Sequence, residues 1–526
     1  MFCRTKVRRN KDGSTVEYLQ IVESVREEGK IRQRIICTLG RLDELKDRDI
    51  TRLAESLQRF SKEKELAGLA RDALACLWSR QVGPAWVMRR LFEMTGLADI
   101  LVKEADTTKI AFNVKEAVFA MVLNRLMDPC SKRQVSEWAA KDVYEPPFAA
   151  LELQHYYRAL DFLADRKDAI EEELFARTRD LFNQELSLVF FDTTTTYFEG
   201  MKAQPAAFCY SKDHRPDRLQ VVIGLLIDAS GTPIAHQVLP GRTADMHAFL
   251  DAIKACTRRF NLRRIVMVGD RGMANAKTVK ALEEAGYEYI LGVKMRRGKE
   301  VHETVLSRAG RFHKVDETLE VKNVEVNGRR YVICYNPEEA RRDAEVRREV
   351  IASLEKKLGR GIKPLIGNRM YARYLTFDKE HASLNRTLID DEARYDGKYV
   401  LMTNTALPTE DIARAYKQLW MVEYAFREMK SNLDLRPVYH FAESRIRGHI
   451  MVCFLAFYLE TIFHRRLAEI APEARPSSVL ADLARVHAVK IKNGDKTAII
   501  RTELTGDAHL AFRAARLQVP SRVLQT

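Results

Sequence analysis

The spacing of apolar residues changes several times along the chain, and each change marks a predicted domain boundary. Residues 1–48 show strand-like alternation, as in 18–25, and predict a small N-terminal β-sheet domain. In residues 49–184 apolar side chains recur at helical spacing, as in 110–126, so this region is predicted to be α-helical.

Residues 185–295 alternate strands and helices in a defined order. The predicted elements are a strand ending at Asp192, strands at 221–228 and 234–239, a helix at 245–260, a strand ending near Asp270, a helix at 275–285 and a strand at 287–293. Three strands joined by short turns, then helix, strand, helix and strand, is the order of the ribonuclease-H-like fold. In that fold the first and fourth strands lie side by side, which would bring Asp192 close to Asp270.

The pattern changes again after residue 295. Residues 296–397 combine strand-like segments with a charged helix at 338–358, which Asn336-Pro337 can start as cap and first-turn proline. A strand and one long helix at 409–431 follow, and 490–496 is expected to be an exposed loop.

The predicted fold class is α/β, with a ribonuclease-H-like core interrupted by a β-rich insertion. An N-terminal β plus α-helical region precedes this core, and a helical C-terminal region follows it. The predicted domains are 1–48 (β-sheet), 49–184 (helical), 185–295 (core, first part), 296–397 (β-rich insertion), 398–470 (core, second part) and 471–526 (C-terminal helical region). A chain of 526 residues is too long for one hydrophobic core, which agrees with several domains.

The charge balance favours a polyanionic partner. The chain has 87 basic and 73 acidic residues, a net charge of +14 and an isoelectric point near 9.3. Lys and Arg that neutralise phosphates release condensed counterions, which favours nucleic-acid binding. The alternative is a basic protein without such a partner. For the helical region 49–184, the two interpretations are a DNA-binding region and a scaffold.

Cysteines and apolar runs predict a cytoplasmic protein. The eight cysteines are scattered without a CxxC pair, so a zinc site is not expected, and Cys37 and Cys453 are predicted to be reduced core residues. The N-terminus lacks the apolar segment of a signal peptide. The longest apolar run, 450–459, is half a membrane span and predicts a buried helix, so no membrane association is expected.

Three acidic residues carry the candidate chemistry. Asp192 and Asp270 each end an apolar run, and Glu423 lies within the predicted helix at 409–431. Carboxylates are the hard ligands that Mg²⁺ prefers, and two such ions promote in-line displacement at phosphodiesters. A single Asp after a strand is more often a turn residue or helix cap, as Asp228 before Ser230-Gly231 illustrates.

The predicted helix around Glu423 gives a more specific pattern. Tyr416, Glu423 and Lys430 are spaced by seven residues and so share one stripe of a helix. Glu428 points about 140° away from Glu423 and is a poor third ligand. The alternative is an ordinary amphipathic helix with an exposed Glu-to-Lys stripe. That alternative explains Glu423 less well, because Trp420 flanks it closely.

These motifs resemble the DDE transposases of bacterial insertion sequences, in the branch with a Tyr-(2)-Arg-(3)-Glu-(6)-Lys signature. Tyr416, Glu423 and Lys430 match that spacing, whereas Leu419 stands where the branch has Arg. The family's two Asp motifs are matched by Phe-Asp192-Thr-Thr-Thr and Val-Gly-Asp270-Arg-Gly-Met. The resemblance covers residues 185–460, including the β-rich insertion.

The resemblance implies a mechanism and partners. Asp192, Asp270 and Glu423 would bind two Mg²⁺ ions per active site, with Mn²⁺ able to substitute, for cleavage at transposon ends and strand transfer by cut-and-paste transposition. Tyr416 and Lys430 would hold phosphates of double-stranded DNA near the transposon end. Members of this branch typically pass through a hairpin on the transposon end, and they act as homodimers.

Further DNA contacts are assigned from charge and position. The resemblance implies that a Trp can stabilise a flipped base, which makes Trp420 a candidate, with a core position as the alternative; Arg427 or Lys417 can compensate for Leu419. Cations of the loop 210–218 are candidate phosphate clamps, with a solvated surface loop as the alternative, and Arg271 and 295–299 are comparable candidates. The loop candidates are Lys212, His214, Arg215 and Arg218. Recognition of the terminal repeats is expected from the N-terminal 180 residues.

Three functions remain to be separated. The leading one is a metal-dependent DNA transposase located in the bacterial cytosol. The others are a catalytically inactive, transposase-derived DNA-binding protein and another ribonuclease-H-like nuclease. The complete acidic triad argues against the second, and the insertion together with the Tyr-Glu-Lys stripe argues against the third.

Overall fold

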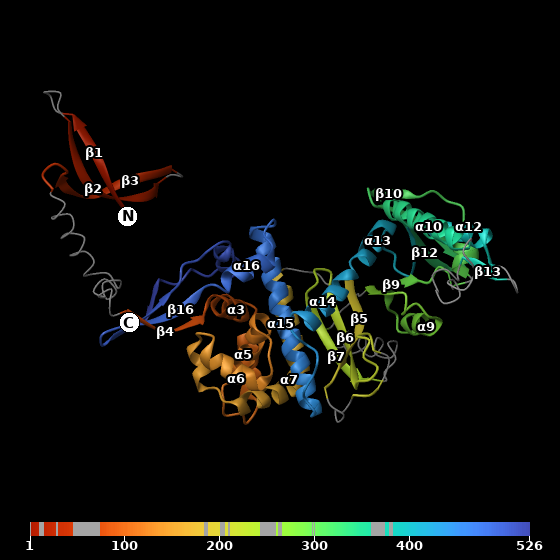
Figure 1. The fold of residues 1–526 in the computed structure, drawn as a ribbon, viewed down its shortest axis with the longest axis horizontal. Helices are drawn as coiled ribbons and strands as arrows, with labels where there is room; N and C mark the ends of the chain where they lie inside the picture. The colour runs from red at the N-terminus through yellow and green to blue at the C-terminus, as the bar shows by residue number, and fades with distance from the viewer. Residues whose placement is uncertain are drawn as a thin grey trace. The chain divides into compact units, whose positions relative to one another are not determined.

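The computed structural model describes most of the chain, and its elements form two units (Figure 1). The described residues are 2–9, 15–27, 30–45, 74–182, 188–199, 206–208, 211–241, 259–260, 266–296, 298, 300–358, 374–377 and 382–525. The first unit comprises residues 1–80, 487–503 and 520–526. The second comprises residues 81–486 and 504–519.

The first unit contains two β-sheets. The N-terminal sheet has the order β1-β2-β3 and is antiparallel, with β1 (Phe2–Arg9), β2 (Thr15–Glu27) and β3 (Lys30–Arg41). The other sheet has the order β18-β17-β16-β4, with β4 (Leu74–Gln81), β16 (His487–Asn493), β17 (Lys496–Arg501) and β18 (Val523–Gln525). β2 contains the alternating segment 18–25, and all three strands lie within the predicted β-sheet domain 1–48.

Two helix predictions are wrong in this unit. Residues 74–81 fall within the predicted helical region but form β4, and the C-terminal region contains β16 to β18. The predicted loop 490–496 is a hairpin, because Gly494 adopts a left-handed φ of 56° in the turn between the paired residues Asn493 and Lys496. Residues 46–73, where helix was also predicted, lie outside the described residues.

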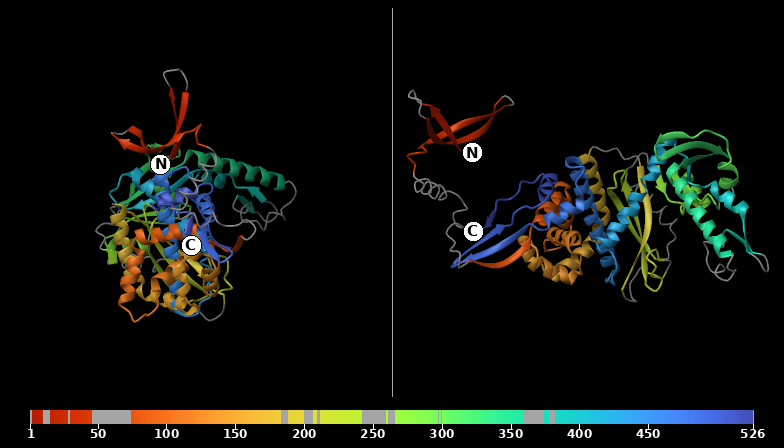
Figure 2. Two further views of the ribbon diagram at one scale, coloured as in Figure 1. Left: turned by 90° about the vertical axis from the view of Figure 1, so that its left-hand side faces the viewer. Right: turned by 45° about the horizontal axis from the view of Figure 1, so that its top comes forward.

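In the second unit, helices pack around α15. These helices are α3 (Gly83–Met94), α4 (Leu97–Asp106), α5 (Val114–Met127), α6 (Lys132–Lys141), α7 (Leu153–Phe182), α15 (Glu443–Ile470), α16 (Pro476–Leu483) and α17 (Ala508–Ala514). α15 contacts α3, α5, α7 and α17, and it lies between helices α3–α6 and the sheet (Figures 1 and 2). It is long and apolar enough to span a membrane, with a mean hydropathy of 1.5, but 83% of that window is buried inside the protein. The predicted buried helix is therefore confirmed.

A nine-stranded sheet forms the α/β part of this unit. Its order is β10-β11-β12-β15-β9-β8-β5-β6-β7. The five core strands are β5 (Leu188–Tyr197), β6 (Gln220–Asp228), β7 (Pro233–Pro240), β8 (Val266–Gly269) and β9 (Glu288–Val293). β5, β6 and β7 pair antiparallel, whereas β5, β8 and β9 pair parallel. This is the predicted ribonuclease-H-like arrangement, with α9 (Ala276–Glu284) between β8 and β9. Most of the predicted helix 245–260 lies outside the described residues.

The insertion continues this sheet instead of forming a fully separate subdomain. β10 (His313–Asp316), β11 (Leu319–Val326) and β12 (Arg329–Tyr335) join the core through β15 (Lys398–Thr403), which pairs antiparallel with β9. The remaining insertion elements are α10 (Pro337–Leu358), β13 (Leu375–Phe377), β14 (Ala382–Leu384) and α12 (Arg386–Ala393). Asn336 caps α10 as predicted, because its side chain accepts hydrogen bonds from the amides of Glu338 and Glu339.

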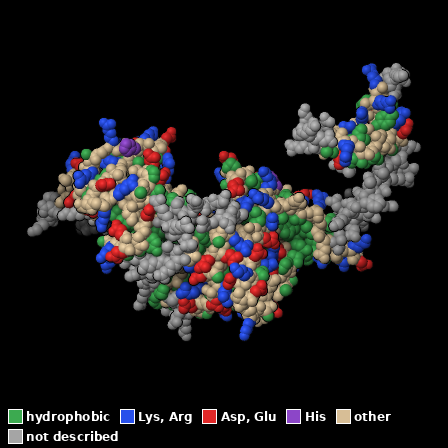
Figure 3. Space-filling model, turned by 180° about the vertical axis from the view of Figure 1, so that it is seen from behind, with side chains coloured by type: hydrophobic (Ala, Val, Ile, Leu, Met, Phe, Trp, Pro, Cys, Tyr) green, Lys and Arg blue, Asp and Glu red, His purple; other side chains and the backbone are tan. Residues whose placement is uncertain are grey.

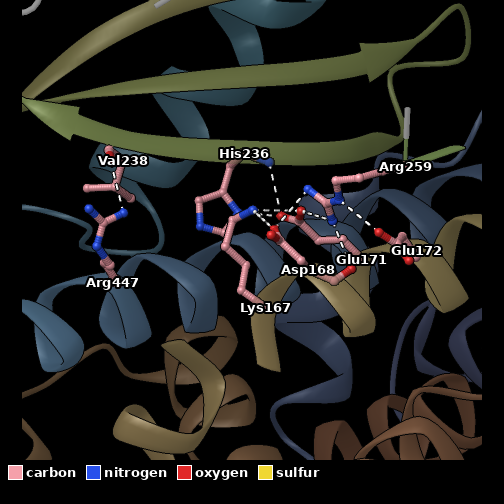
Figure 4. A network of polar contacts seen from close by, with 8 residues as sticks. All are labelled: Lys167, Asp168, Glu171, Glu172, His236, Val238, Arg259 and Arg447. Carbon is pink, nitrogen blue, oxygen red and sulfur yellow. Dashed lines mark hydrogen bonds and ion pairs between the residues drawn. The ribbon is translucent and has the colours of Figure 1, made fainter. Parts of the chain in front are cut away.

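A buried ionic network fastens α7 to β7 (Figure 4). Glu171 of α7 is fully buried; its carboxylate lies 2.8 Å from Lys167 Nζ, 2.8 Å from His236 Nδ1 and 2.9 Å from Arg259. Burial alone would raise the pKa of Glu171, but the three surrounding bases outweigh it and lower that pKa. We call these four residues the Glu171 network.

Two sequence inferences about single residues are tested by burial. Cys453 is buried in α15 as predicted, but Cys37 is exposed on β3, so it is not a core residue. Asp228 serves its turn as predicted, because its Oδ1 accepts hydrogen bonds from the amides of Ser230 and Thr232. On the face drawn in Figure 3, basic and acidic side chains are interspersed, so net charge alone does not locate a DNA surface there.

Candidate active site

The strand register places Asp192 and Asp270 at matching positions of two neighbouring parallel strands. β5 and β8 are parallel, and Phe190 pairs with Val268. Asp192 and Asp270 each follow that pair by two residues, and neighbouring strands lie about 4.8 Å apart. Because side chains alternate along a strand, Asp192 faces the same side as Phe190. The prediction that these two strands are neighbours is confirmed, but the prediction that the first strand ends at Asp192 is wrong, because β5 continues to Tyr197.

Glu423 comes from the helix that covers this face. α14 (Trp420–Ser431) packs on β5 and β6, and its Val422 and Phe426 belong to the same apolar core as Phe190 and Val268. Asp192 keeps a quarter of its side chain exposed, and Asp270 and Glu423 are exposed. We call Asp192, Asp270 and Glu423 the carboxylate edge.

The predicted single helix at 409–431 is wrong. It divides into α13 (Thr409–Lys417) and α14, with a turn at Gln418 and Leu419. Leu419 is 8% exposed and packs in the core, and a tight turn there buries it. This explains why an apolar residue stands where the related signature has Arg.

The phenol of Tyr416 is influenced electrostatically by two residues of the carboxylate edge. Burial raises the pKa of its phenol, and the charges of Asp270 and Glu423 raise it further, whereas Arg271 lowers it. The phenol therefore lies within electrostatic reach of both carboxylates. A Cβ at Gly292 of β9 would lie 2.2 Å from Tyr416 Oη, so only glycine at this position admits the ring.

The donor chemistry of the carboxylate edge suits a hard divalent cation. Among the described residues, however, no group of three or more His, Cys, Asp or Glu side chains is close enough to hold a metal ion. Like charges repel, so three carboxylates without a cation are expected to stand apart. The backbone thus brings the ligand types together, while their oxygens do not form a closed site.

Lys212 is built into this site beside Asp192. Its Nζ donates to the Thr193 carbonyl at 2.6 Å and to Thr193 Oγ1 at 3.2 Å, and it lies 3.8 Å from Asp192 Oδ1. Its backbone amide donates to Thr195 Oγ1 at 2.9 Å. A cation predicted from a basic loop is therefore held next to the first carboxylate.

Lys430 lies in a different environment from the exposed stripe that the seven-residue spacing suggested. Its Nζ is 2.8 Å from Asp213 Oδ1, and the two side chains are 9% and 4% exposed. Arg436 contacts the same oxygen of Asp213. Sequence reasoning missed Asp213 and Arg436, although an acid beside Lys212 in the basic loop 210–218 was the available signal. This ion-paired cluster fastens the loop to α14.

The other predicted contact residues are distributed around the site. Trp420 is 58% exposed, and its ring meets Tyr424 edge-on with centroids 6.1 Å apart. Arg427 is exposed and lies over the same tyrosine. Arg271 is exposed and lies beside Tyr416.

The remaining loop cations differ in how far they are engaged. Arg215 donates two hydrogen bonds to Asp217, both 3.0 Å long. His214 is exposed and has a left-handed φ of 57°. Arg218 lies 3.2 Å from Glu199.

A basic cavity opens next to Arg271. It has a volume of about 340 Å³, and its lining includes Lys294, Arg329 and one acid, Glu300. Of the predicted segment 295–299, Arg296 is engaged with Glu392 at 2.9 Å, while residues 297 and 299 lie outside the described residues. Positive charge therefore continues from the carboxylate edge toward the insertion.

Comparison with known proteins identifies the family to which this chain belongs. The transposase DDE domain matches residues 183–459, more than half of the 526 residues, and the N-terminal domain of IS1634 family transposases matches residues 3–71. None of the curated proteins matches the chain.

Several solved structures show a weak likeness. A piggyBac transposase synaptic complex with hairpin DNA is 9% identical with a TM-score of 0.37, over 76% of this chain and 79% of that chain. A Mos1 transposase paired-end complex with the left transposon end is 14% identical with a TM-score of 0.15, over 35% of this chain and 60% of that chain. A Mos1 mariner paired end complex with Mn gives the same values. Scores this low support no argument about the site.

Proposed function

This chain belongs to the DDE transposases, and from that premise we propose which of its residues perform the reaction. Membership makes it a DNA transposase, an enzyme that uses divalent metal ions to cleave and join DNA strands. We assign catalysis to Asp192, Asp270 and Glu423. The observation that carries this assignment is that Asp192 and Asp270 lie at matching positions of the adjacent parallel strands β5 and β8, beside α14, which carries Glu423.

The carboxylate edge would hold two Mg²⁺ ions, for which Mn²⁺ can substitute. When bound, such ions activate the attacking water or 3′-OH and stabilise the leaving oxygen. Asp192 would supply a ligand from β5, Asp270 one from the position that follows β8, and Glu423 one from α14. Lys212, held by Thr193, places a positive charge beside Asp192 where a scissile phosphate would enter.

The surrounding residues position the DNA. Lys212, His214, Arg215, Arg271 and Arg427 hold backbone phosphates, and Trp420 offers an exposed ring to an unstacked base. Tyr416 contacts a phosphate beside Asp270. Lys430 has two possible roles. It can fix, through its ion pair with Asp213, the loop that carries Lys212. It can also leave Asp213 and bind a DNA phosphate directly.

The overall reaction is cut-and-paste transposition in the bacterial cytosol. A homodimer would bind the two terminal inverted repeats and deliver them to target DNA. The matched N-terminal region, residues 3–71, belongs to the part of the chain expected to recognise the repeats.

Cleavage of linear DNA carrying the element's ends tests the assignment. We expect cleavage at the ends with Mg²⁺ or Mn²⁺ and none with EDTA. Glu423→Gln should abolish cleavage while end binding persists, whereas the matched control Glu428→Gln on the same helix should cleave.

Two other outcomes would select different functions. Binding without cleavage by the wild-type protein would indicate an inactive, transposase-derived DNA-binding protein. Preferential cleavage of branched or RNA-containing substrates would indicate another ribonuclease-H-like nuclease.

A further inference from the structure

A small pocket in the second unit involves α6, α15 and the segment that follows α14. Its volume is about 100 Å³, and its lining includes Arg125, Lys132, Asp434, His440 and His449. The proposed reaction uses none of these residues, so the pocket needs an explanation of its own.

Buried polar contacts fix the walls of this pocket. Asn124 Nδ2 donates to the Asp128 carbonyl at 2.7 Å, and Arg125 donates to the Asp434 carbonyl at 3.1 Å and to the Cys130 carbonyl. Asn124 is 0% exposed and Arg125 is 3% exposed. Hydrogen bonds between two distant parts of the chain therefore hold the walls of the pocket together.

Lys132 lines the pocket with a side-chain nitrogen that has no hydrogen-bond partner among the described residues, as do Arg125 Nε and His449 Nδ1. The side chain of Lys132 is 3% exposed. The carboxylate of Asp434 lies 3.6 Å from Arg125 and so compensates that guanidinium. Burial, and then the charge of Arg125, lowers the pKa of Lys132 to about 7. A buried cation without a partner is costly, and an anion would remove this cost.

The remaining groups do not supply that anion. His449 Nε2 donates to the Leu435 carbonyl at 3.2 Å, and its buried Nδ1 has no hydrogen-bond partner among the described residues. Burial lowers the pKa of His440 to about 4 and that of His449 well below 6.5, so both rings are neutral near pH 7. Lys132 also begins α6, and a helix N-terminus carries partial positive charge.

Charges further out do not change this balance. Asp161 lowers the local positive charge near His440, but it is itself bound by Ser444 at 2.6 Å and lies 3.6 Å from Arg445. The described groups around the pocket therefore supply no counterion of its own to the protonated form of Lys132.

We propose that this pocket binds one phosphate group of the DNA backbone. Its volume suits a single phosphate and not a whole nucleotide. Tyr439, which lines the pocket, and the nearby Phe441 are 61% and 59% exposed, so a sugar-phosphate chain has apolar surface beside the anion. The inference rests on the chain's being a DNA transposase, but not on the assignment of its catalytic carboxylates.

Salt dependence of DNA binding tests this proposal with the full-length protein in EDTA. Each neutralised phosphate contributes about 0.9 to the slope of log K against log salt concentration. Lys132→Met should reduce the slope by about that amount and weaken binding roughly ten- to hundredfold. The control Lys141→Met should leave both unchanged, since Lys141 is on the same helix but 71% exposed. Lys132→Arg should keep the slope.

A thermal arm separates the two sources of phosphate. Inorganic phosphate should raise the Tm of the wild-type protein but not that of Lys132→Met, and Lys132→Met alone should not lower the Tm. If phosphate raises the wild-type Tm while the DNA slope is identical in Lys132→Met, the pocket binds a free anion and the proposal is overturned. A lowered Tm for Lys132→Met with an unchanged slope would give the lysine a structural role and overturn it equally. Because no cleavage is measured, failure of the catalytic assignment would leave these outcomes intact.

Discussion

In the second unit, the single carboxylate of Glu171 and the three carboxylates of the carboxylate edge have opposite surroundings. Glu171 is fully buried and is contacted by Lys167, His236 and Arg259. The carboxylate edge is solvent-exposed to different degrees, and only Asp192 has a cation within 4 Å among the described ion pairs, Lys212 at 3.8 Å. The difference teaches that one set of charges is neutralised within the protein, whereas the other is left open to cations and DNA.

The comparison gives different expectations for stability and for activity. Removing a charge from the Glu171 network leaves buried cations without a partner, so stability should suffer. Removing a charge from the carboxylate edge reduces repulsion between like charges, so stability should be kept while the chemistry is lost.

The largest effect should come from Asp270→Asn. We expect cleavage of DNA ends to fall by at least about a thousandfold, because Asp270 would no longer bind the metal ions that activate and align the substrate. The Tm should stay the same or rise slightly. Gel assays of end cleavage and a thermal melt measure the two quantities.

Asp228→Asn is the matched control for that change. It also alters an aspartate at a strand end of the same sheet, but one that serves a turn. It should retain most cleavage activity and lose some stability. If Asp270→Asn retained cleavage, Asp270 would not be a catalytic carboxylate.

The second effect should come from Glu171→Gln. Breaking a buried ion pair costs about 3–5 kcal/mol, and here Lys167 and Arg259 would lose their shared carboxylate. The denaturation midpoint should fall accordingly, with cleavage intact at temperatures where the protein is folded. Glu172→Gln, whose side chain is 45% exposed, should change stability by less than about 0.5 kcal/mol.

A third change sharpens the position of Tyr416. Gly292→Ala should displace the tyrosine ring, since the new Cβ would lie 2.2 Å from Oη, and should destabilise by about 1–3 kcal/mol. In a Tyr416→Phe background the closest clash is gone, so Gly292→Ala should cost less. Equal costs in both backgrounds, measured by a double-mutant cycle, would show that Tyr416 does not lie over Gly292.

The smallest effect concerns acid stability. The folded pKa of Glu171 lies below its ordinary value of 4.5, so the unfolded chain binds this proton more readily. The contribution of Glu171 is therefore present above about pH 4.5 and is lost as pH falls. His236, whose pKa burial lowers below 6.5, acts in the same direction.

Unfolding midpoints from pH 7 down to pH 4 measure this dependence. The fall in stability should be less steep in Glu171→Gln than in the wild type. The carboxylate-edge variant Asp270→Asn should follow the wild-type curve. Parallel curves for Glu171→Gln and the wild type would show that the lowered pKa of Glu171 does not make stability depend on pH.

Much of the core was predictable because it depends on local patterns. Alternating and continuous apolar runs specified β5, β6, β7 and β9, and Asn336-Pro337 specified the start of α10. Errors arose where a short pattern was ambiguous. Residues 74–81 form a strand whose partner β16 lies more than 400 residues away, and no local signal records that pairing.

The candidate site was predictable in its residue types and only partly in its geometry. The helix spacing suggested one stripe through Tyr416, Glu423 and Lys430, but the turn at Leu419 divides the helix. In the folded protein Lys430 is buried against the carboxylate of Asp213, which comes from a loop distant in the sequence. Such contacts depend on long-range packing, which periodicity does not encode.

The sequence by itself determined the order of the core strands, the acidic residues that they carry and the family motifs, because these are properties of short segments. The tertiary structure decided what those residues face. It set Asp192 beside Asp270 through the β5–β8 register, joined the insertion to the core sheet through β15, and left Lys132 buried without a counterion. The physical reason is that burial and electrostatic partners arise between segments far apart in the chain.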